Sequence, residues 1–204
     1  MANLIIKPTS GGSLILQDEG GTAAHTIDAS GNHTLSGTTN NLGTITSATK
    51  FPAGHIIQVL QAVKTDTFSG SGTDWVDVTG LSIAITPSVA SHKILVMMNV
   101  TAATQNGQRG GFQILRGSTA ICIADSASTR VRATSGVTSG SDSIWTPVSA
   151  TFLDSPNTTS ATTYKIQSRN ETSGATHVNR SHTDADAASY YRGTSQITVM
   201  EVVA

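Results

Sequence analysis

The side chains best suited to bind a ligand gather in one polar stretch, residues 169–191. It brings cationic, anionic, imidazole and phenol groups close together in sequence, and its strongest candidates are Arg180, His182, Asp184, Asp186, Tyr190 and Tyr191. Paired tyrosine rings can stack on a sugar, while charged groups and an imidazole hydrogen-bond its hydroxyls. The stretch is compatible with a non-catalytic sugar site. The interpretation that we favour is a solvated hairpin loop whose tyrosines only start the last strand.

Metal and thiol chemistry have less support. His182, Asp184 and Asp186 could place nitrogen and oxygen ligands near one another, but the segment lacks the glycine and the distal glutamate of a calcium loop. The single cysteine, Cys122, rules out an internal disulfide and a thiolate zinc cluster. Cys122 follows Ile121 in a predicted strand, so we expect a partly buried structural thiol. No metal or other cofactor is expected.

The sequence also lacks the usual signatures of catalysis. It contains no Gly-x-Ser-x-Gly elbow, no phosphate-binding loop, no His-Glu-x-x-His and no Gly-x-Gly-x-x-Gly. Glycoside cleavage needs two carboxyl groups that flank the scissile bond. The three glutamates, Glu19, Glu171 and Glu201, fall in a predicted turn, a loop and the last strand. We therefore predict no catalytic residues and no enzyme.

Charge and composition narrow the range of partners. The 204 residues carry 12 basic and 13 acidic side chains and are only 4% aromatic, which leaves little for phosphate neutralisation or base stacking. No apolar run approaches the roughly eighteen residues of a membrane-spanning helix, and the run after Met1 is too short for a signal peptide. We expect no nucleic-acid partner, no membrane insertion and no export by the usual route. Serine and threonine number 56 together, so the surface should be neutral and rich in hydroxyls.

Residue preferences indicate an all-β protein. Val, Ile and Thr number 61 together, against 10 Leu and 3 Glu, and β-branched side chains favour the pleated sheet. About ten alternating runs, including a short one at 131–133, recur through residues 51–204 at intervals of about ten residues, as in an antiparallel β-sandwich or jelly roll. The runs His55–Val63 and Lys93–Val100 are apolar on both faces and should be central or subunit-facing strands. In the second run the alternation places Ile94, Val96, Met98 and Val100 on one face. Pro147 should lie on an edge strand or at a bulge.

Residues 1–50 form a different region, an N-terminal arm or shaft. They contain no aromatic residue and no valine. Short apolar groups, at 4–6, 14–16, 27, 35 and 45, alternate with predicted turns, one of them at residues 28–32. Such a segment cannot build its own core, so it needs cover from copies of itself or from a neighbouring protein surface. The alternative is a flexible linker. A homotrimer would supply that cover, and the side chains we assign to particle attachment are Leu4, Ile5, Ile6, Leu14, Ile15 and Leu16.

Three phrases resemble a known group of proteins. Ile114–Ile121, Asn179–Asp184 and Arg192–Val202 are similar to the C-terminal β-domain of small fibre-type virion proteins of tailed phages, especially marine and cyanobacterial ones. The N-terminal pattern of short apolar triplets and Gly-rich turns is similar to their attachment arms. The resemblance implies a homotrimer in which an N-terminal arm, residues 1–50, attaches to the particle and a distal β-sandwich, residues 51–204, faces outward. The resemblance does not indicate which residues of this chain bind a receptor.

These observations favour a trimeric tail-fibre or appendage component of a phage virion, assembled in the host cytoplasm. Its partners would be its own copies, other virion proteins of the tail or capsid, and a host-surface glycan. One alternative is a capsid decoration or head-fibre protein without a receptor role. Another is a non-catalytic carbohydrate-binding module.

Overall fold

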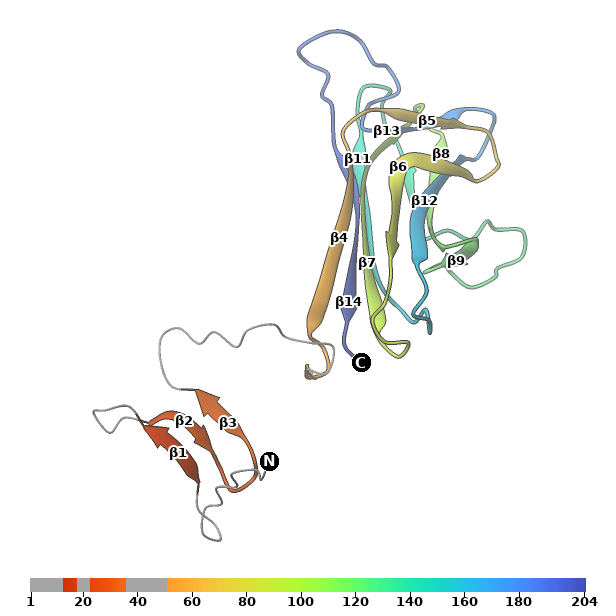
Figure 1. Cartoon of the computed structure of the whole chain (residues 1–204). Helices are drawn as coiled ribbons and strands as arrows, with labels where there is room; N and C mark the ends of the chain where they lie inside the picture. The colour runs from red at the N-terminus through yellow and green to blue at the C-terminus, as the bar shows by residue number, and fades with distance from the viewer. Residues whose placement is uncertain (1–12, 18–22, 36–50) are drawn as a thin grey trace. The chain divides into compact units, whose positions relative to one another are not determined.

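Antiparallel strands dominate the part of the chain that the computed structural model describes, residues 13–17, 23–35 and 51–204, and no helix occurs among those residues. The chain divides into two units, residues 1–50 and 51–204. Figure 1 shows the strands of each unit. The prediction of an all-β chain is confirmed, and two sheets packed face to face support the predicted sandwich.

The first unit holds a three-stranded antiparallel meander of β1 (Leu14–Gln17), β2 (Ala23–Ile27) and β3 (His33–Leu35). The predicted turn at residues 28–32 joins β2 to β3. The Asp28 carboxylate accepts hydrogen bonds from the Ser30 and Asn32 amides, and Gly31 takes the left-handed φ of +80°. The apolar side chains at 4–6 and 45 lie outside the described residues.

Eleven strands make up the second unit, in two sheets. The five-stranded sheet has the order β10-β8-β12-β6, with β9 paired to β8. Its strands are β6 (Val76–Ile85), β8 (Arg109–Arg116), β9 (Thr119–Ile121), β10 (Ser135–Thr138) and β12 (Thr162–Asn170). The six-stranded sheet has the order β4-β14-β7-β13-β5, with β11 paired to β7. Its strands are β4 (Ile56–Lys64), β5 (Phe68–Ser71), β7 (Lys93–Thr104), β11 (Thr146–Asp154), β13 (Ala175–Val178) and β14 (Ser195–Val202).

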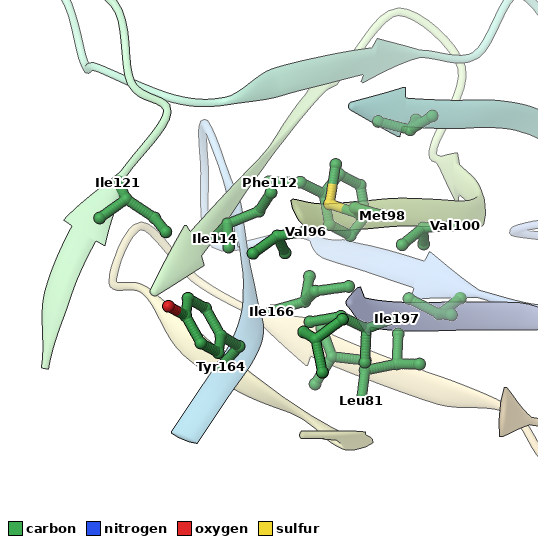
Figure 2. Close-up of a cluster of buried hydrophobic side chains, with 14 of the residues drawn as sticks. Leu81, Val96, Met98, Val100, Phe112, Ile114, Ile121, Tyr164, Ile166 and Ile197 are labelled. Carbon is green, nitrogen blue, oxygen red and sulfur yellow. The ribbon is translucent and has the colours of Figure 1, made fainter. Parts of the chain in front are cut away.

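The core lies between these two sheets (Figure 2). Alternate side chains of each strand point inward, as the period of two along a strand requires. The five-stranded sheet contributes Leu81, Phe112, Ile114, Tyr164 and Ile166, and the six-stranded sheet contributes Val96, Met98, Val100, Ile197 and Val199. The predicted inward set of Ile94, Val96, Met98 and Val100 is confirmed.

Two details of the sequence prediction are wrong. Strand β9 ends at Ile121, and Cys122 follows it with a left-handed φ of 52°, so it is not a strand residue. Its thiol is half-buried, and burial raises its pKa. The predicted strand at 131–133 is part of the loop between β9 and β10, because its short alternation finds no partner strand among the described residues.

The two runs that are apolar on both faces occupy different places. Strand β7 is central, with β14 and β13 on one side and β11 on the other. Strand β4 is at the edge of its sheet, paired with β14 alone in the described part of the chain. Pro147 lies in β11, which pairs only with β7 among the described residues, so its missing amide donor is tolerated.

Candidate binding surfaces

The six candidate residues of the 180–191 region lie in the long loop between β13 and β14. The structure brings Arg180 and Asp184 together: the guanidinium Nε is 3.6 Å from the carboxylate, and Arg192 donates to the same carboxylate at 2.6 Å. Arg180 also donates to the backbone carbonyls of Ser181 and His182. These charged groups therefore bond to the loop itself.

The other candidates point to different neighbours. His182 lies against His177, with Nδ1 3.1 Å from the His177 Nε2. The Tyr190 hydroxyl is 3.2 Å from the Ser143 hydroxyl, while Asp186 and Tyr191 are exposed, Tyr191 by 69%. The tyrosines precede β14 by several residues and do not start it. The structure therefore does not gather the two tyrosines and the charged groups into one hydrogen-bonded cluster.

Asn179 fixes the start of this loop. It is fully buried with a φ of 62°, and its amide nitrogen donates to the carbonyls of Lys64 and Asp66 at 2.9 and 2.8 Å. Its amide oxygen accepts from the Ser195 hydroxyl at 2.6 Å, at the start of β14. Sequence reasoning singled out Asn179 only as part of a polar stretch, because the Lys64 and Asp66 carbonyls are more than a hundred residues away.

A hollow of about 570 Å³ lies on the outer face of the five-stranded sheet. One cross-strand row forms its base: Arg169 of β12 is opposite Gly111 of β8, and Gly111 is opposite Gly136 of β10. Because Gly111 and Gly136 have no side chains, neither fills the surface above the backbone at its position. Ala124, Val131 and Ala133 of the β9–β10 loop line the hollow as well. We call this site the glycine-row hollow.

The charged groups of the glycine-row hollow differ in their pairing. Arg109 donates to Glu171 through its backbone amide and its guanidinium, at 2.9 and 2.8 Å, and the guanidinium lowers the pKa of Glu171. Arg169 instead places its guanidinium over the Trp75 ring, 5.8 Å from the ring centroid, and has no carboxylate partner among the described residues. The site therefore carries one unpaired positive charge.

A polar row lies beside the hollow on the same face. Gln113 donates to Gln167 at 2.7 Å, Gln167 donates to Asp77 at 2.7 Å, and Lys165 donates to the other Asp77 oxygen at 2.7 Å. The hydrogen bond from Lys165 contributes most to holding the pKa of Asp77 below its usual value. This outer face thus combines an aromatic ring, amides and charges.

The sequence carried a signal for the glycine-row hollow that our prediction missed. Glycines within a strand indicate a bulge or a close backbone approach, and Gly110, Gly111 and Gly136 all lie within strands. That Gly111 and Gly136 are neighbours follows only from the pairing of β8 with β10. Arg169 was inside the polar stretch but was not among its leading candidates.

Two neighbouring rows on the outer face of the six-stranded sheet carry no charged side chain across four strands. One row joins Val59 to Met200, Leu95 and Leu153, and the next joins Gln61 to Thr198, Met97 and Thr151. Val59, Met97 and Leu153 are 55%, 40% and 52% exposed. We call this surface the open face. Groups of exposed apolar side chains are typical of interaction surfaces.

Of the six residues assigned to particle attachment, Leu14, Ile15 and Leu16 lie in β1, and Ile15 and Leu16 are exposed. Leu4, Ile5 and Ile6 lie outside the described residues. No group of three or more His, Cys, Asp or Glu side chains suited to a metal ion occurs within residues 13–17, 23–35 and 51–204. No helix in the same part of the chain is long and apolar enough to cross a membrane.

Comparison with known proteins identifies no family. No protein-family model and no curated protein matches this chain. Among solved structures, those of infectious bursal disease virus align with it: the Gt strain at 15% identity and TM-score 0.38, covering 81% of this chain, and the VP2 subviral particle at 13% identity and TM-score 0.39, covering 80%. The chain spans about 43% of each of those chains. Similarity at this level carries no functional argument, so function is inferred from the residues of this chain.

Proposed function

We propose that this protein is a non-catalytic structural component of a virus particle. It is present as a homotrimer, attached to the particle through residues 1–50, and it presents the β-sandwich of residues 51–204 to the host surface. We favour a tail fibre or appendage, in keeping with the phrases it shares with phage fibre proteins.

The open face is the observation that carries this proposal. Its two central rows contain valine, leucine, methionine, threonine and glutamine and no charged side chain, although the chain has 25 charged residues (12 basic and 13 acidic). The outward-facing positions of a sheet with one solvated face are usually occupied by charged and polar residues. Uncharged rows with exposed apolar side chains are typical of a surface buried between subunits, where charged residues are depleted.

The edge of the same sheet supports assembly from several copies. Strand β4 runs through Ile56–Val63 without a charge or a proline, and its one charged residue, Lys64, is buried. Monomeric proteins protect exposed edges of this length with charges, prolines or bulges. The β4 edge has one register irregularity at its start, between Ile56 and Gln58, and no charge or proline from there to Val63. Such an edge is suited to contact with a neighbouring subunit.

The N-terminal unit supports attachment to a larger body. Its described strands have three to five residues each, and Ile15, Leu16 and Leu35 remain exposed. So little buried apolar area gives a small unit little stability of its own. A contact with a particle surface through Leu14–Leu16, and through the residues 4–6 of the sequence pattern, would bury this area.

Two measurements test the proposal. Sedimentation equilibrium of the purified full chain should give three times the 21.0 kDa of one chain, and antibody labelling in electron micrographs should place it on purified particles. A few labelled sites at the tail would support the fibre role, whereas labelling over the whole capsid would move the protein to the decoration role. A monomer at micromolar concentration that is absent from particles would refute the proposal.

A further inference from the structure

We propose that the glycine-row hollow binds a sugar residue that carries a carboxylate, with Arg169 as its charge partner and Trp75 as part of its wall. The inference rests on the proposed function in that contact with a host surface requires a ligand site. It replaces the 180–191 loop as the place of that site.

An unpartnered polar group in the hollow is the first argument. Arg169 Nε is buried and has no hydrogen-bond partner among the described residues. Arg169 lines the hollow. Buried polar atoms in folded proteins nearly always find a partner, so this unpartnered donor indicates a group that a ligand or its bound water satisfies.

Charge selects the ligand class. Glu171 neutralises Arg109 through two hydrogen bonds, whereas the Arg169 guanidinium lies over the Trp75 ring and has no carboxylate partner within the described residues. A guanidinium in a partly desolvated hollow binds a carboxylate through two parallel N–H···O bonds. The site therefore fits a ligand with one negative charge better than a neutral sugar.

Shape and lining indicate a sugar. The volume of about 570 Å³ lies within the range of small-molecule sites. Trp75, Ala124, Val131 and Ala133 offer apolar contacts for the C–H face of a sugar ring, and Gly136, which has no side chain, allows the ring to approach the sheet backbone.

The position of Arg169 is fixed before any ligand arrives. Its backbone pairs with Gly111, and a side chain at Gly111 would meet the Arg169 stem at 3.5 Å and the Trp75 ring at 3.2 Å. The stem and the ring therefore occupy the space that the glycine leaves open. A charge held in place in this way loses less side-chain entropy when it binds.

Saturation-transfer NMR on the purified full chain tests this inference, because the method detects weak binding. The acidic probes are glucuronic acid, galacturonic acid, N-acetylneuraminic acid and 3-deoxy-octulosonic acid, and the neutral controls are glucose and galactose. We expect at least one acidic probe to bind and both neutral sugars to bind at least about tenfold more weakly, the effect of one charge-assisted contact. Binding of no acidic probe, or equal binding of acidic and neutral sugars, would overturn the inference.

Variants locate the site. Arg169→Gln should weaken binding of the acidic probe by about tenfold or more, whereas Arg192→Gln, an exposed arginine of the β13–β14 loop, should leave it unchanged. Val131→Glu adds a negative charge to the wall at a position that is 55% exposed and so tolerated by the fold, and it should repel the probe. Val131→Gln is its neutral control. Loss of binding in Arg192→Gln but not in Arg169→Gln would return the site to the loop.

Competition experiments distinguish recognition of the whole sugar from recognition of its carboxylate alone. Particle labelling tests the virion role independently of the ligand. If acetate displaces the probe as effectively as the free acidic sugar does, the hollow recognises a carboxylate alone, and the sugar part of the inference is wrong. Failure of all acidic probes with a protein that is trimeric and present on particles refutes only the ligand. Binding by a protein absent from particles refutes only the virion role.

Discussion

At the scale of single residues, the polar groups of the β13–β14 loop bond mainly to one another and to the ends of neighbouring strands. Arg180, Asp184 and Arg192 form one charged group, and Asn179 ties the loop to the Lys64 and Asp66 carbonyls. Groups already satisfied within the protein offer little to a ligand. These contacts of Asn179, Arg180, Asp184 and Arg192 help to order a long loop.

Asn179→Ala should destabilise the fold by about 3 kcal/mol, because it leaves buried carbonyls and the Ser195 hydroxyl unpaired and places alanine at a positive φ. Asn179→Gly loses the same hydrogen bonds but avoids alanine at a positive φ, so its free energy of unfolding should lie between those of the wild type and Asn179→Ala. Urea unfolding at neutral pH measures both. A loss below about 1 kcal/mol for the alanine variant, which is typical of an ordinary substitution, would contradict the role we give to Asn179.

His177 should make the stability depend on pH. Burial, followed by the nearby Arg180 and His182, lowers its pKa from 6.5 to about 4, while Asp184 acts in the opposite direction. Its ring lies 2.8 Å from the Ser69 hydroxyl and 3.1 Å from His182. Below pH 6.5 the unfolded chain takes up a proton that the folded protein refuses, so stability falls as the pH drops toward 4. The total loss from this group is about 3 kcal/mol.

The measurement is urea unfolding between pH 7 and pH 4.5 for the wild type and for His177→Gln. The two free energies should converge as the pH falls, because the variant lacks this proton uptake. His55→Gln, at an exposed histidine, is the control and should follow the wild type. Parallel curves for the wild type and His177→Gln would show that His177 is not held neutral by the fold.

Whether the sequence alone predicts a feature at this scale depends on how far apart along the chain its residues lie. The inward set Ile94, Val96, Met98 and Val100 is local, because alternation along one strand decides it. The base of the glycine-row hollow is not local: Gly111 and Gly136 meet through the pairing of β8 with β10, and Arg169 joins them through β12. The density of polar residues along the chain therefore gave no indication of this base.

At the scale of elements, β4 is the strand whose position the sequence left open. Its apolar character on both faces fits a central strand as well as a strand facing another subunit. The structure places it at the edge, with Leu60 and Ala62 packed on the core and Val59 and Val63 exposed. In the proposed trimer, the outward-facing Val59 and Val63 contact a neighbouring chain.

The double variant Val59→Lys and Val63→Lys should convert the trimer to monomers without changing the sheet content, because two charges on the open face would be buried without partners in the assembly. Val89→Lys is the matched control, since Val89 is also exposed but lies in the connection between β6 and β7. Sedimentation velocity measures the mass, and circular dichroism checks the fold. A double variant that remains trimeric would show that the subunits meet through another surface.

At the scale of the whole molecule, the two units hold no sheet in common among the described strands. Strands β1 to β3 form one sheet within residues 1–50, and both sheets of the sandwich lie within residues 51–204. The start of the second unit is joined to the end of the chain, since Gly54 donates to the Val203 carbonyl and Val203 donates to the His55 carbonyl. Removal of residues 1–50 therefore breaks none of these sandwich hydrogen bonds.

A fragment of residues 51–204 should consequently fold by itself, with a cooperative unfolding transition at the midpoint that the sandwich shows in the full chain. Because the open face and the β4 edge are both contained in this fragment, it should also remain a trimer in sedimentation experiments. It should no longer label particles, because the apolar triplet of β1 is missing. Thermal unfolding, sedimentation equilibrium and particle binding measure these three properties separately. A folded but monomeric fragment would assign the subunit contacts to residues 1–50, and a trimeric fragment that still binds particles would assign attachment to the sandwich.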